Sequence, residues 1–391
     1  MIIDHAYVVG YGLIDVLGNT PADCFGRMLD EYDYTTDVVT DGCKITRGML
    51  VADDSIILPP DAPKGMTKMQ QMSLYATTYA LNHSKLPHSK NVAVIFSTIV
   101  NDLETISEIY PRLLDNKRVR PSHIINRIPD MMSSYVAQYY QFMGTTAAVY
   151  SACATGINSI DYAMRLLDEY DYVVVGSGDA GCMPWAIKSF NAFGAMSNHS
   201  CPFDDARNGF VMGDGVGVLI LQSEKAVKQF NSQVYAKLYT PGISNDAFDH
   251  TNPAEDGRGS ILAINKAMQS VTGPIHAVNA HATSTPIGDV IEYNVITDKF
   301  GNIPIYAPKS KIGHTMAGSG VVETVYAIES MRQGIIPHIH NLTNTSIDTL
   351  DCLVRNNKEF PADTVLRTLN NSFGFGGKCA SQIIEVDRHL Q

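Results

Sequence analysis

Four segments of the sequence carry side chains suited to nucleophilic and acid–base chemistry, and the first contains a cysteine. Cys153 stands in the segment 151–156, Ser-Ala-Cys-Ala-Thr-Gly, just before residues with the apolar spacing of a helix. A thiol in the first turn of a helix faces unpaired backbone N–H groups and the positive end of the helix dipole, which favour the thiolate. The alternative is a buried structural cysteine, since free cysteines are often buried.

The second segment places a histidine at the end of an apolar strand. His281 follows the predicted strand Ile275–Asn279 and precedes the hydroxyl residues Thr283 and Thr285. Small neighbours and a strand end suit an imidazole that points into a cleft. The alternative is a core histidine with satisfied hydrogen bonds, followed by hydroxyls that cap a helix.

The third segment joins a lysine and a second histidine. The residues 309–314, Lys-Ser-Lys-Ile-Gly-His, follow another predicted strand, and Glu323 lies on the predicted helix beyond them. We expect Lys309 and His314 to share one loop, where a Lys–Glu pair could orient the imidazole and set its tautomer. A solvated basic loop is the alternative.

The fourth segment is a glycine-rich turn near the end of the chain. Residues 371–377 read Asn-Ser-Phe-Gly-Phe-Gly-Gly, and their backbone N–H groups could donate to a developing oxyanion. An ordinary tight turn is the alternative. Neither a dinucleotide-binding glycine motif nor a phosphate-binding P-loop occurs in the required context.

The elements that must position these segments alternate along the chain, which predicts an α/β fold with buried strands. Strands are expected at 92–96, 147–150, 172–176, 216–221, 275–279, 305–307 and 366–370. Helices are expected at 69–82, 131–142, 156–170, 260–270, 287–300 and 320–333.

The composition excludes several classes of protein. The formal charge of −11 is unsuited to general nucleic-acid binding, and no apolar run of about 18 residues predicts a membrane span. The N-terminal residues read as a first strand rather than a signal peptide. Seven cysteines, Cys43 among them, without a C-x-x-C pair indicate free thiols in the cytoplasm, with neither a disulfide framework nor a zinc site.

Together and in this order, the motifs resemble those of the elongating β-ketoacyl-[acyl-carrier-protein] synthases, which have a Cys-His-His site. The resemblance covers nearly the whole chain and includes PFDDARNGFVMGDG at 202–215. It implies a thiolase fold with a five-layered α-β-α-β-α architecture, built from two pseudo-symmetric halves. We expect residues 1–230 to form the half with the nucleophile and residues 231–391 to form the half with the histidines.

The resemblance also implies a role for each residue. Cys153 matches the acyl-carrying nucleophile, His281 and His314 the two active-site histidines, and Lys309 with Glu323 the pair that holds the second histidine's network. Phe375 matches the gating phenylalanine, and its N–H with that of Cys153 would form the oxyanion hole. Thr283 and Thr285 match the hydroxyls that bind the phosphopantetheine arm.

The implied activity is a decarboxylating condensation of an acyl group on Cys153 with malonyl-acyl carrier protein, in fatty acid elongation. It implies an acyltransferase without metal or cofactor, because phosphopantetheine arrives on the carrier protein. A homodimer is expected. The alternative is the ketosynthase subunit of a type II polyketide or aryl-polyene system, paired with a chain-length factor. A non-enzymatic carrier-binding scaffold is a third hypothesis, against which the complete set of catalytic residue types argues.

A few positions depart from the family's pattern. Ala282 replaces a usual glycine and needs an allowed backbone conformation. Cys201 replaces an arginine that meets the carrier in many relatives, and Lys378-Cys379 replaces Thr-Asn. Docking an acidic carrier requires a basic patch, for which Lys64 and Lys68 are candidates. A solvated face without a partner is the alternative.

Overall fold

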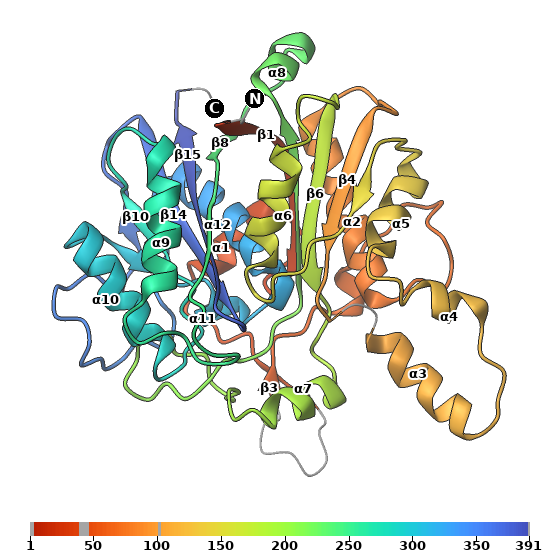
Figure 1. Ribbon diagram of the computed structural model, residues 1–391, viewed down its shortest axis with the longest axis horizontal. Coiled ribbons are helices and arrows are strands. Elements are labelled where there is room, and N and C mark those ends of the chain that lie inside the picture. The colour runs from red at the N-terminus through yellow and green to blue at the C-terminus, as the bar shows by residue number, and fades with distance from the viewer. Residues whose placement is uncertain (1–3, 39–46, 101–102, 390–391) are drawn as a thin grey trace.

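The computed structural model describes residues 4–38, 47–100 and 103–389 of the 391-residue chain (Figure 1). Cys43 lies outside the described residues, as do the first three residues of the predicted first strand. Where they are described, the chain forms a large central sheet with helices on both faces. Among these residues, no helix combines the length and the apolar character needed to cross a membrane.

The N-terminal half contributes five strands to the sheet. In spatial order they run β5-β4-β6-β7-β1. Strands β5, β4 and β6 pair in parallel, whereas β7 pairs antiparallel with both β6 and β1. The bounds are β1 (His5–Asp15), β4 (Val92–Ser97), β5 (Thr146–Ala147), β6 (Tyr172–Asp179) and β7 (Gly215–Gln222).

The C-terminal half repeats this arrangement. Its spatial order is β11-β10-β14-β15-β8, again with two parallel pairings followed by two antiparallel ones. The bounds are β8 (Ala236–Tyr239), β10 (Ala277–Asn279), β11 (Ile305–Tyr306), β14 (Val365–Gly374) and β15 (Lys378–Asp387). Strand β9 (Gly242–Asn245) adds to β15, and β8 pairs with β1, which joins the halves. The two pseudo-symmetric halves are thereby confirmed.

Two helices lie between the half-sheets. Helix α6 (Thr155–Met164) packs against β6 and β4, and α12 (Ser319–Gln333) packs against α6 and against strands of both halves. A Cβ atom at Gly320 would lie 2.4 Å from the backbone nitrogen of Ile157, so glycine is needed for this approach. Helix α2 (Lys68–Ser84) covers the outer face of β1 and β7, and α9 (Arg258–Ala267) covers β9 and β15. These are the five layers predicted for the thiolase fold.

The remaining elements surround these layers (Figure 1). The helices are α1 (Pro21–Met28), α3 (Leu103–Leu114), α4 (Pro121–Ile125), α5 (Met131–Tyr140), α7 (Pro184–Asn191), α8 (Glu224–Phe230), α10 (Gly288–Phe300) and α11 (Lys309–Ile312). Two small hairpins pair β2 (Thr36–Asp37) with β3 (Arg47–Gly48) and β12 (Ile335–Ile336) with β13 (Lys358–Glu359). Short 3₁₀ turns occur at Asp53–Ser55, Met268–Ser270 and Met316–Gly318.

Three local predictions need correction. The helix predicted at 156–170 ends at Met164, and backbone bonds between residues three apart tighten the turns that follow. The strand predicted at 147–150 is only Thr146–Ala147, an edge strand with a single neighbour. Lys309, expected to share a loop with His314, begins the short helix α11, whose burial also excludes the alternative of a solvated loop. The boundary between residues 230 and 231 stays a prediction.

Candidate active site

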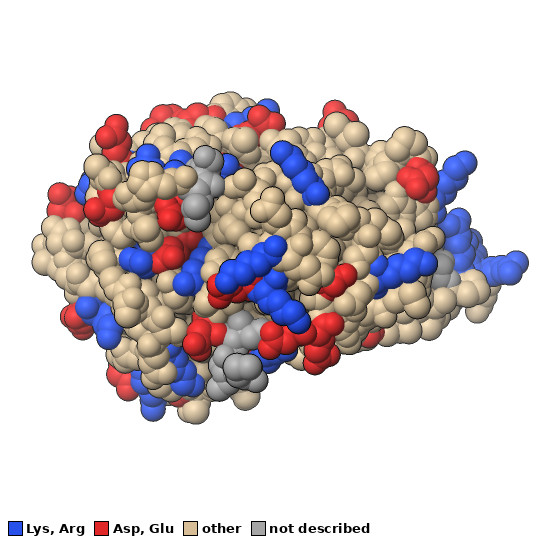
Figure 2. Space-filling model, turned by 90° about the horizontal axis from the view of Figure 1, so that it is seen from above, with Lys and Arg blue, Asp and Glu red and all other residues tan. Residues whose placement is uncertain are grey.

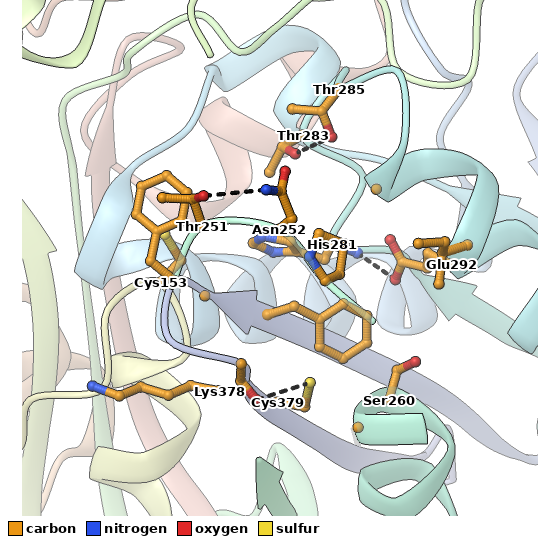
Figure 3. Close-up of a pocket in the computed structure, with 18 of the residues that line it drawn as sticks. Cys153, Thr251, Asn252, Ser260, His281, Thr283, Thr285, Glu292, Lys378 and Cys379 are labelled. Carbon is orange, nitrogen blue, oxygen red and sulfur yellow. Dashed lines mark hydrogen bonds between the residues drawn. The ribbon is translucent and has the colours of Figure 1, made fainter. Parts of the chain in front are cut away.

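One cavity brings together side chains from both halves of the molecule. It has an empty volume of about 1010 Å³, and its lining includes Cys153, His281 and His314. Figure 3 shows Cys153 and His281 facing the same space. Because β5 and β11 occupy equivalent places in the two halves, the turns that follow them deliver Cys153 and His314 to this interface.

The turn that carries Cys153 is shaped by backbone geometry. Ala152 adopts a positive φ of 48°, and α6 begins at Thr155, whose hydroxyl accepts from the N–H of Ser151 at 2.8 Å. A Cβ atom at Gly374 of β14 would lie 2.7 Å from the backbone nitrogen of Cys153. Glycine at 374 therefore allows the glycine-rich turn, which continues to Phe375, to approach the nucleophile.

His314 contacts the thiol directly. Its Nε2 lies 3.0 Å from Cys153 Sγ. The backbone N–H of Met316 donates to Nδ1 at 3.2 Å, and Ser319 Oγ lies 3.0 Å from the same nitrogen. Since Nδ1 accepts, the neutral ring carries its proton on Nε2 and directs it into the cavity.

His281 is held by its backbone rather than by its ring. One carboxylate oxygen of Glu292 accepts from the N–H of His281, the other accepts from that of Ala282, each at 2.8 Å, and Asn371 also donates to Glu292. Ala282 has a φ of 27°, so the departure from glycine is accommodated in a conformation that this clamp holds. The Nδ1 atom of His281 is buried without a hydrogen-bond partner among the described residues.

Sequence reasoning did not identify Glu292 as a site residue. It lies on α10, within the predicted helix 287–300, and is almost fully buried. An acid on a helix face that must pack against the sheet was the available signal. Its partners are two backbone N–H groups and an amide, which a sequence pattern does not reveal.

Lys309 and Glu323 form a fully buried ion pair, with 2.5 Å between Nζ and Oε1. Burial, and then the nearby charge of Lys309, lower the pKa of both His281 and His314 well below the usual value. Both rings are therefore neutral near pH 7. The orientation of His314, predicted to depend on this pair, comes instead from the contacts of Met316 and Ser319.

The thiol of Cys153 experiences opposing influences. Burial raises its pKa to about 12, and the charge of Lys309 opposes that rise. The start of α6 and the Nε2–H of His314 also favour the thiolate. The thiol is thus protonated at rest, and the groups around it stabilise the charge when the proton leaves.

The remaining predicted residues line the same cavity. Thr283 and Thr285 lie together on one side, with 3.3 Å between their hydroxyl oxygens, and Lys378 and Cys379 lie on the other (Figure 3). Phe375 also lines the cavity. The two departures at 378 and 379 therefore line the same cavity as Cys153.

The two lysines predicted to dock a carrier differ in the structure. Lys64 is exposed. Lys68 begins α2 and forms an ion pair with the buried Asp214, with 2.9 Å between Nζ and Oδ2. Figure 2 shows other basic side chains gathered at the end of the molecule where Figure 1 places α3 and α4. Cys201 is buried, and its N–H donates to Ser284 Oγ, so it is not part of that surface.

The chain is similar to known proteins over most of its length. The profile of the β-ketoacyl synthase N-terminal domain matches residues 40–226, and that of the β-ketoacyl synthase C-terminal domain matches residues 235–343. It is 29% identical to 3-oxoacyl-[acyl-carrier-protein] synthase 2 of Vibrio cholerae over 97% of this chain and 98% of that protein. It is 34% identical to the mitochondrial 3-oxoacyl-[acyl-carrier-protein] synthase of Arabidopsis thaliana over 68% of this chain and 61% of that protein.

A solved structure shows the same fold. The ishigamide ketosynthase/chain length factor superposes with a TM-score of 0.87 at 23% identity, covering 98% of this chain and 99% of that one. The matched profiles cover more than half of the sequence and include the cysteine, both histidines and the Lys–Glu pair. The chain belongs to the β-ketoacyl synthase family of condensing enzymes.

Proposed function

We propose that this protein condenses an acyl group, held as a thioester on Cys153, with malonyl-acyl carrier protein, and that it acts in fatty acid elongation in the cytoplasm. The products are 3-oxoacyl-acyl carrier protein and CO₂. The observation that carries the proposal is the thiol of Cys153 beside the Nε2–H of His314, with His281 on the same cavity. The ring centroids of the two histidines are 5.5 Å apart, which leaves both in reach of one small group.

The first step is acyl transfer. The thiol of Cys153 loses its proton as it attacks the thioester carbonyl of an acyl carrier protein. The carrier thiolate leaves and takes up a proton, so the step exchanges one thiol and one thioester for another. The backbone N–H groups of Cys153 and Phe375 would stabilise the oxyanion of the tetrahedral intermediate. Their proximity is supported by the close approach of Gly374 to the Cys153 nitrogen.

The second step creates the carbon nucleophile. The malonyl thioester oxygen accepts hydrogen bonds from Nε2–H of His281 and of His314, and the carboxylate leaves as CO₂ to give an enolate. Its carbon attacks the Cys153 thioester, the Cys153 thiolate leaves, and the new carbon–carbon bond remains in the 3-oxoacyl product. Neutral imidazoles suit this role because they donate without a net charge that would hold the malonyl carboxylate.

The carrier protein would supply the phosphopantetheine arm, and these steps use no other cofactor. Thr283 and Thr285 line the cavity and are half-buried, and the arm would contact them there. Lys64 would contact the acidic carrier. Lys68 is paired with Asp214, so we expect it to contribute less to docking than Lys64. A substitution at Lys64 therefore tests docking without disturbing the ion pair of Lys68.

The proposal includes a homodimer. Strand β5 ends the sheet, and an unpaired edge is a ready site for pairing with a second chain. Exposed apolar side chains occur on α3 and α4, and one precedes β5: Tyr110, Leu113, Leu114, Ile124, Ile125 and Met143. An exposed apolar group of this kind supports an interface between proteins.

The test uses purified protein with acyl-acyl carrier protein and malonyl-acyl carrier protein, and follows product masses. A carrier mass increased by two carbons, formed by this protein alone, would support the proposal. The variant Cys153→Ala should form no such product. Cys379→Ala is the matched control, because Cys379 lines the same cavity and is as buried as Cys153. Absence of both condensation and malonyl decarboxylation would contradict the proposal and favour a carrier-binding scaffold.

A second candidate is the ketosynthase subunit of a type II polyketide or aryl-polyene system. It is favoured by the likeness in fold to the ishigamide ketosynthase/chain length factor. The same assay distinguishes the two, since this candidate predicts condensation only after a chain-length factor is co-expressed.

A further inference from the structure

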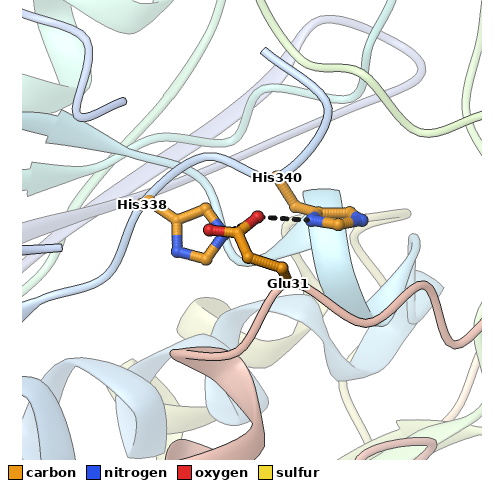
Figure 4. A group of neighbouring side chains, drawn as sticks. All are labelled: Glu31, His338 and His340. Carbon is orange, nitrogen blue, oxygen red and sulfur yellow. Dashed lines mark ion pairs between the residues drawn. The ribbon is translucent and has the colours of Figure 1, made fainter. Parts of the chain in front are cut away.

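Away from the catalytic cavity, three potential metal ligands meet between two distant segments. Glu31 follows α1, and His338 and His340 follow β12. Figure 4 shows the carboxylate of Glu31 between the two imidazole rings. Its Oε2 lies 3.5 Å from Nε2 of His338 and 3.9 Å from Nδ1 of His340. One ligand atom from each residue lies within 4.8 Å of the other two.

The ring nitrogens that face Glu31 are buried and unsatisfied. The side chains of His338 and His340 are 3% and 9% exposed. Neither Nε2 of His338 nor either ring nitrogen of His340 has a hydrogen-bond partner among the described residues. Buried polar atoms are normally hydrogen-bonded, so the two nitrogens that face Glu31, Nε2 of His338 and Nδ1 of His340, call for a ligand.

The tautomer of a neutral His338 ring is set by a neighbouring amide. Asn357 donates from Nδ2 to the carbonyl of Leu29 at 2.9 Å, which fixes the orientation of its amide. Its Oδ1 therefore accepts from Nδ1–H of His338, at 2.9 Å. The lone pair on Nε2 of His338 is then free and directed toward Glu31. A hydrogen bond to the second ring nitrogen is the usual support for a histidine that binds a metal.

Both segments are also anchored. The buried ammonium of Lys311 donates to the carbonyl groups of Asp30 and Tyr32 and to the carboxylate of Asp30, at 2.6 to 2.9 Å. These contacts hold the backbone on both sides of Glu31, and Asp30 compensates the charge of Lys311. The N–H of His340 donates to Ser310 of α11 at 3.0 Å.

We propose that Glu31, His338 and His340 bind a divalent transition-metal ion, Zn²⁺ foremost, with water as the fourth ligand. Two imidazoles and a carboxylate are a donor set that suits Zn²⁺ and disfavours Mg²⁺ and Ca²⁺. Tetrahedral bonds of about 2.0–2.1 Å place ligand atoms roughly 3.4 Å apart. The Glu31 oxygen lies 3.5 and 3.9 Å from the two imidazole nitrogens, and the three ligand atoms lie within 4.8 Å of one another. Glu31 is 85% exposed and can move toward the ion, and a small rotation of the two imidazoles would complete the tetrahedron.

The metal would act as a clamp. It would join the segment after α1 to the segment that packs on α11, the helix that begins with the active-site residue Lys309. Sequence reasoning expected no metal, because it considered cysteine patterns, and the two histidines meet an acid that lies some three hundred residues earlier in the chain.

The experiment is a Zn²⁺ titration of untagged, chelator-stripped protein in competition with a chromophoric chelator. It uses the Cys153→Ala background, so that the catalytic thiol and histidines do not bind the metal together. We expect one Zn²⁺ per chain, a rise in Tm with Zn²⁺, and no response to Mg²⁺. The variants H338A and H340A should weaken binding by about 100-fold or more, and Asn357→Ala by about 10-fold or more.

The variant E31Q tests binding without unfolding the protein, because the side chain of Glu31 is exposed. It should weaken Zn²⁺ binding strongly, whereas Glu359→Gln, a change of another exposed acid, should not. No saturable binding, or equal binding by the background protein and E31Q, would overturn the proposal. The readout is independent of condensing activity, so it stands or falls separately from the proposed function.

Discussion

The turns after β5 and β11 occupy equivalent places in the two halves, yet they prepare their side chains by different means. The turn after β5 presents Cys153 through backbone geometry, with Ala152 at a positive φ and Gly374 in close approach. The turn after β11 presents His314 through hydrogen bonds to its ring, beside the buried Lys309–Glu323 pair. The N-terminal half positions a nucleophile. The C-terminal half keeps its two imidazoles neutral, because burial and the charge of Lys309 lower their pKa.

The largest expected effect is a loss of condensation without a loss of decarboxylation, which would distinguish the roles of the two halves. Cys153→Ala removes the nucleophile and should lower condensation by on the order of 10⁴-fold or more. Malonyl decarboxylation depends on the histidines and should survive. Carrier masses measure both reactions in one assay. Loss of decarboxylation together with condensation would show that the halves do not act separately.

Removing one partner of the buried Lys309–Glu323 pair should destabilise the folded protein strongly. Glu323→Gln leaves the charge of Lys309 buried and unpaired, so we expect a loss of about 3–5 kcal/mol in the free energy of unfolding. Replacing both partners by apolar residues, as in K309M with E323L, should cost much less.

Denaturant unfolding measures these differences. Glu224→Gln is the control in the N-terminal half, because its pair with Lys228 is exposed and should matter little. If Glu323→Gln lowered the free energy of unfolding as little as Glu224→Gln, burial would not make the pair important for stability.

The donor role of His314 should appear in the decarboxylation rate. His314→Ala removes one donor to the enolate oxygen and should lower that rate by about 10²–10³-fold. Ser319→Ala removes one contact to Nδ1 and leaves the N–H of Met316, so its loss should be smaller. Equal rates for H314A and the unchanged protein would remove His314 from this step.

The smallest expected effect is a dependence of stability on pH. Burial lowers the pKa of His281 in the folded state. Below about pH 6.5 this residue is therefore protonated in the unfolded chain and still neutral in the folded chain. The free energy of unfolding should therefore fall, through this residue, by about 1.4 kcal/mol per pH unit as the pH decreases.

Comparison with His281→Asn isolates that contribution from the other titrating groups. The stability of the unchanged protein relative to this variant should decline below pH 6.5 and stay constant above it. A constant difference across the range would mean that His281 is protonated alike in both states.

The long regular elements were predictable from the sequence. The helix expected at 320–333 is α12 at Ser319–Gln333, and that expected at 69–82 is α2 at Lys68–Ser84. Runs of this length combine helix propensity with few breakers, and their ends vary by one or two residues. The order of the motifs was also enough to expect that Cys153, His281 and His314 share a cavity, which the structure shows.

What the sequence could not provide depends on contacts between distant residues. The carboxylate of Glu292 accepts from the backbone N–H of His281, and Nδ1 of His314 accepts from the backbone N–H of Met316. Both contacts depend on backbone groups. The meeting of Glu31 with His338 requires the fold itself. None of these leaves a periodic pattern in the chain, because periodicity records only which face of an element is buried.

The central claim is that a thiol from one half and two imidazoles from the other act in sequence on one substrate. A single-turnover experiment tests it most directly: Cys153 is acylated first, malonyl-acyl carrier protein is then added, and the masses of enzyme and carrier are followed. We predict that the His281→Ala, His314→Ala double variant becomes acylated on Cys153 and then retains its acyl group, whereas the unchanged protein transfers it to give the 3-oxoacyl carrier. Transfer by the double variant at the unchanged rate, or acylation at another residue, would contradict the account.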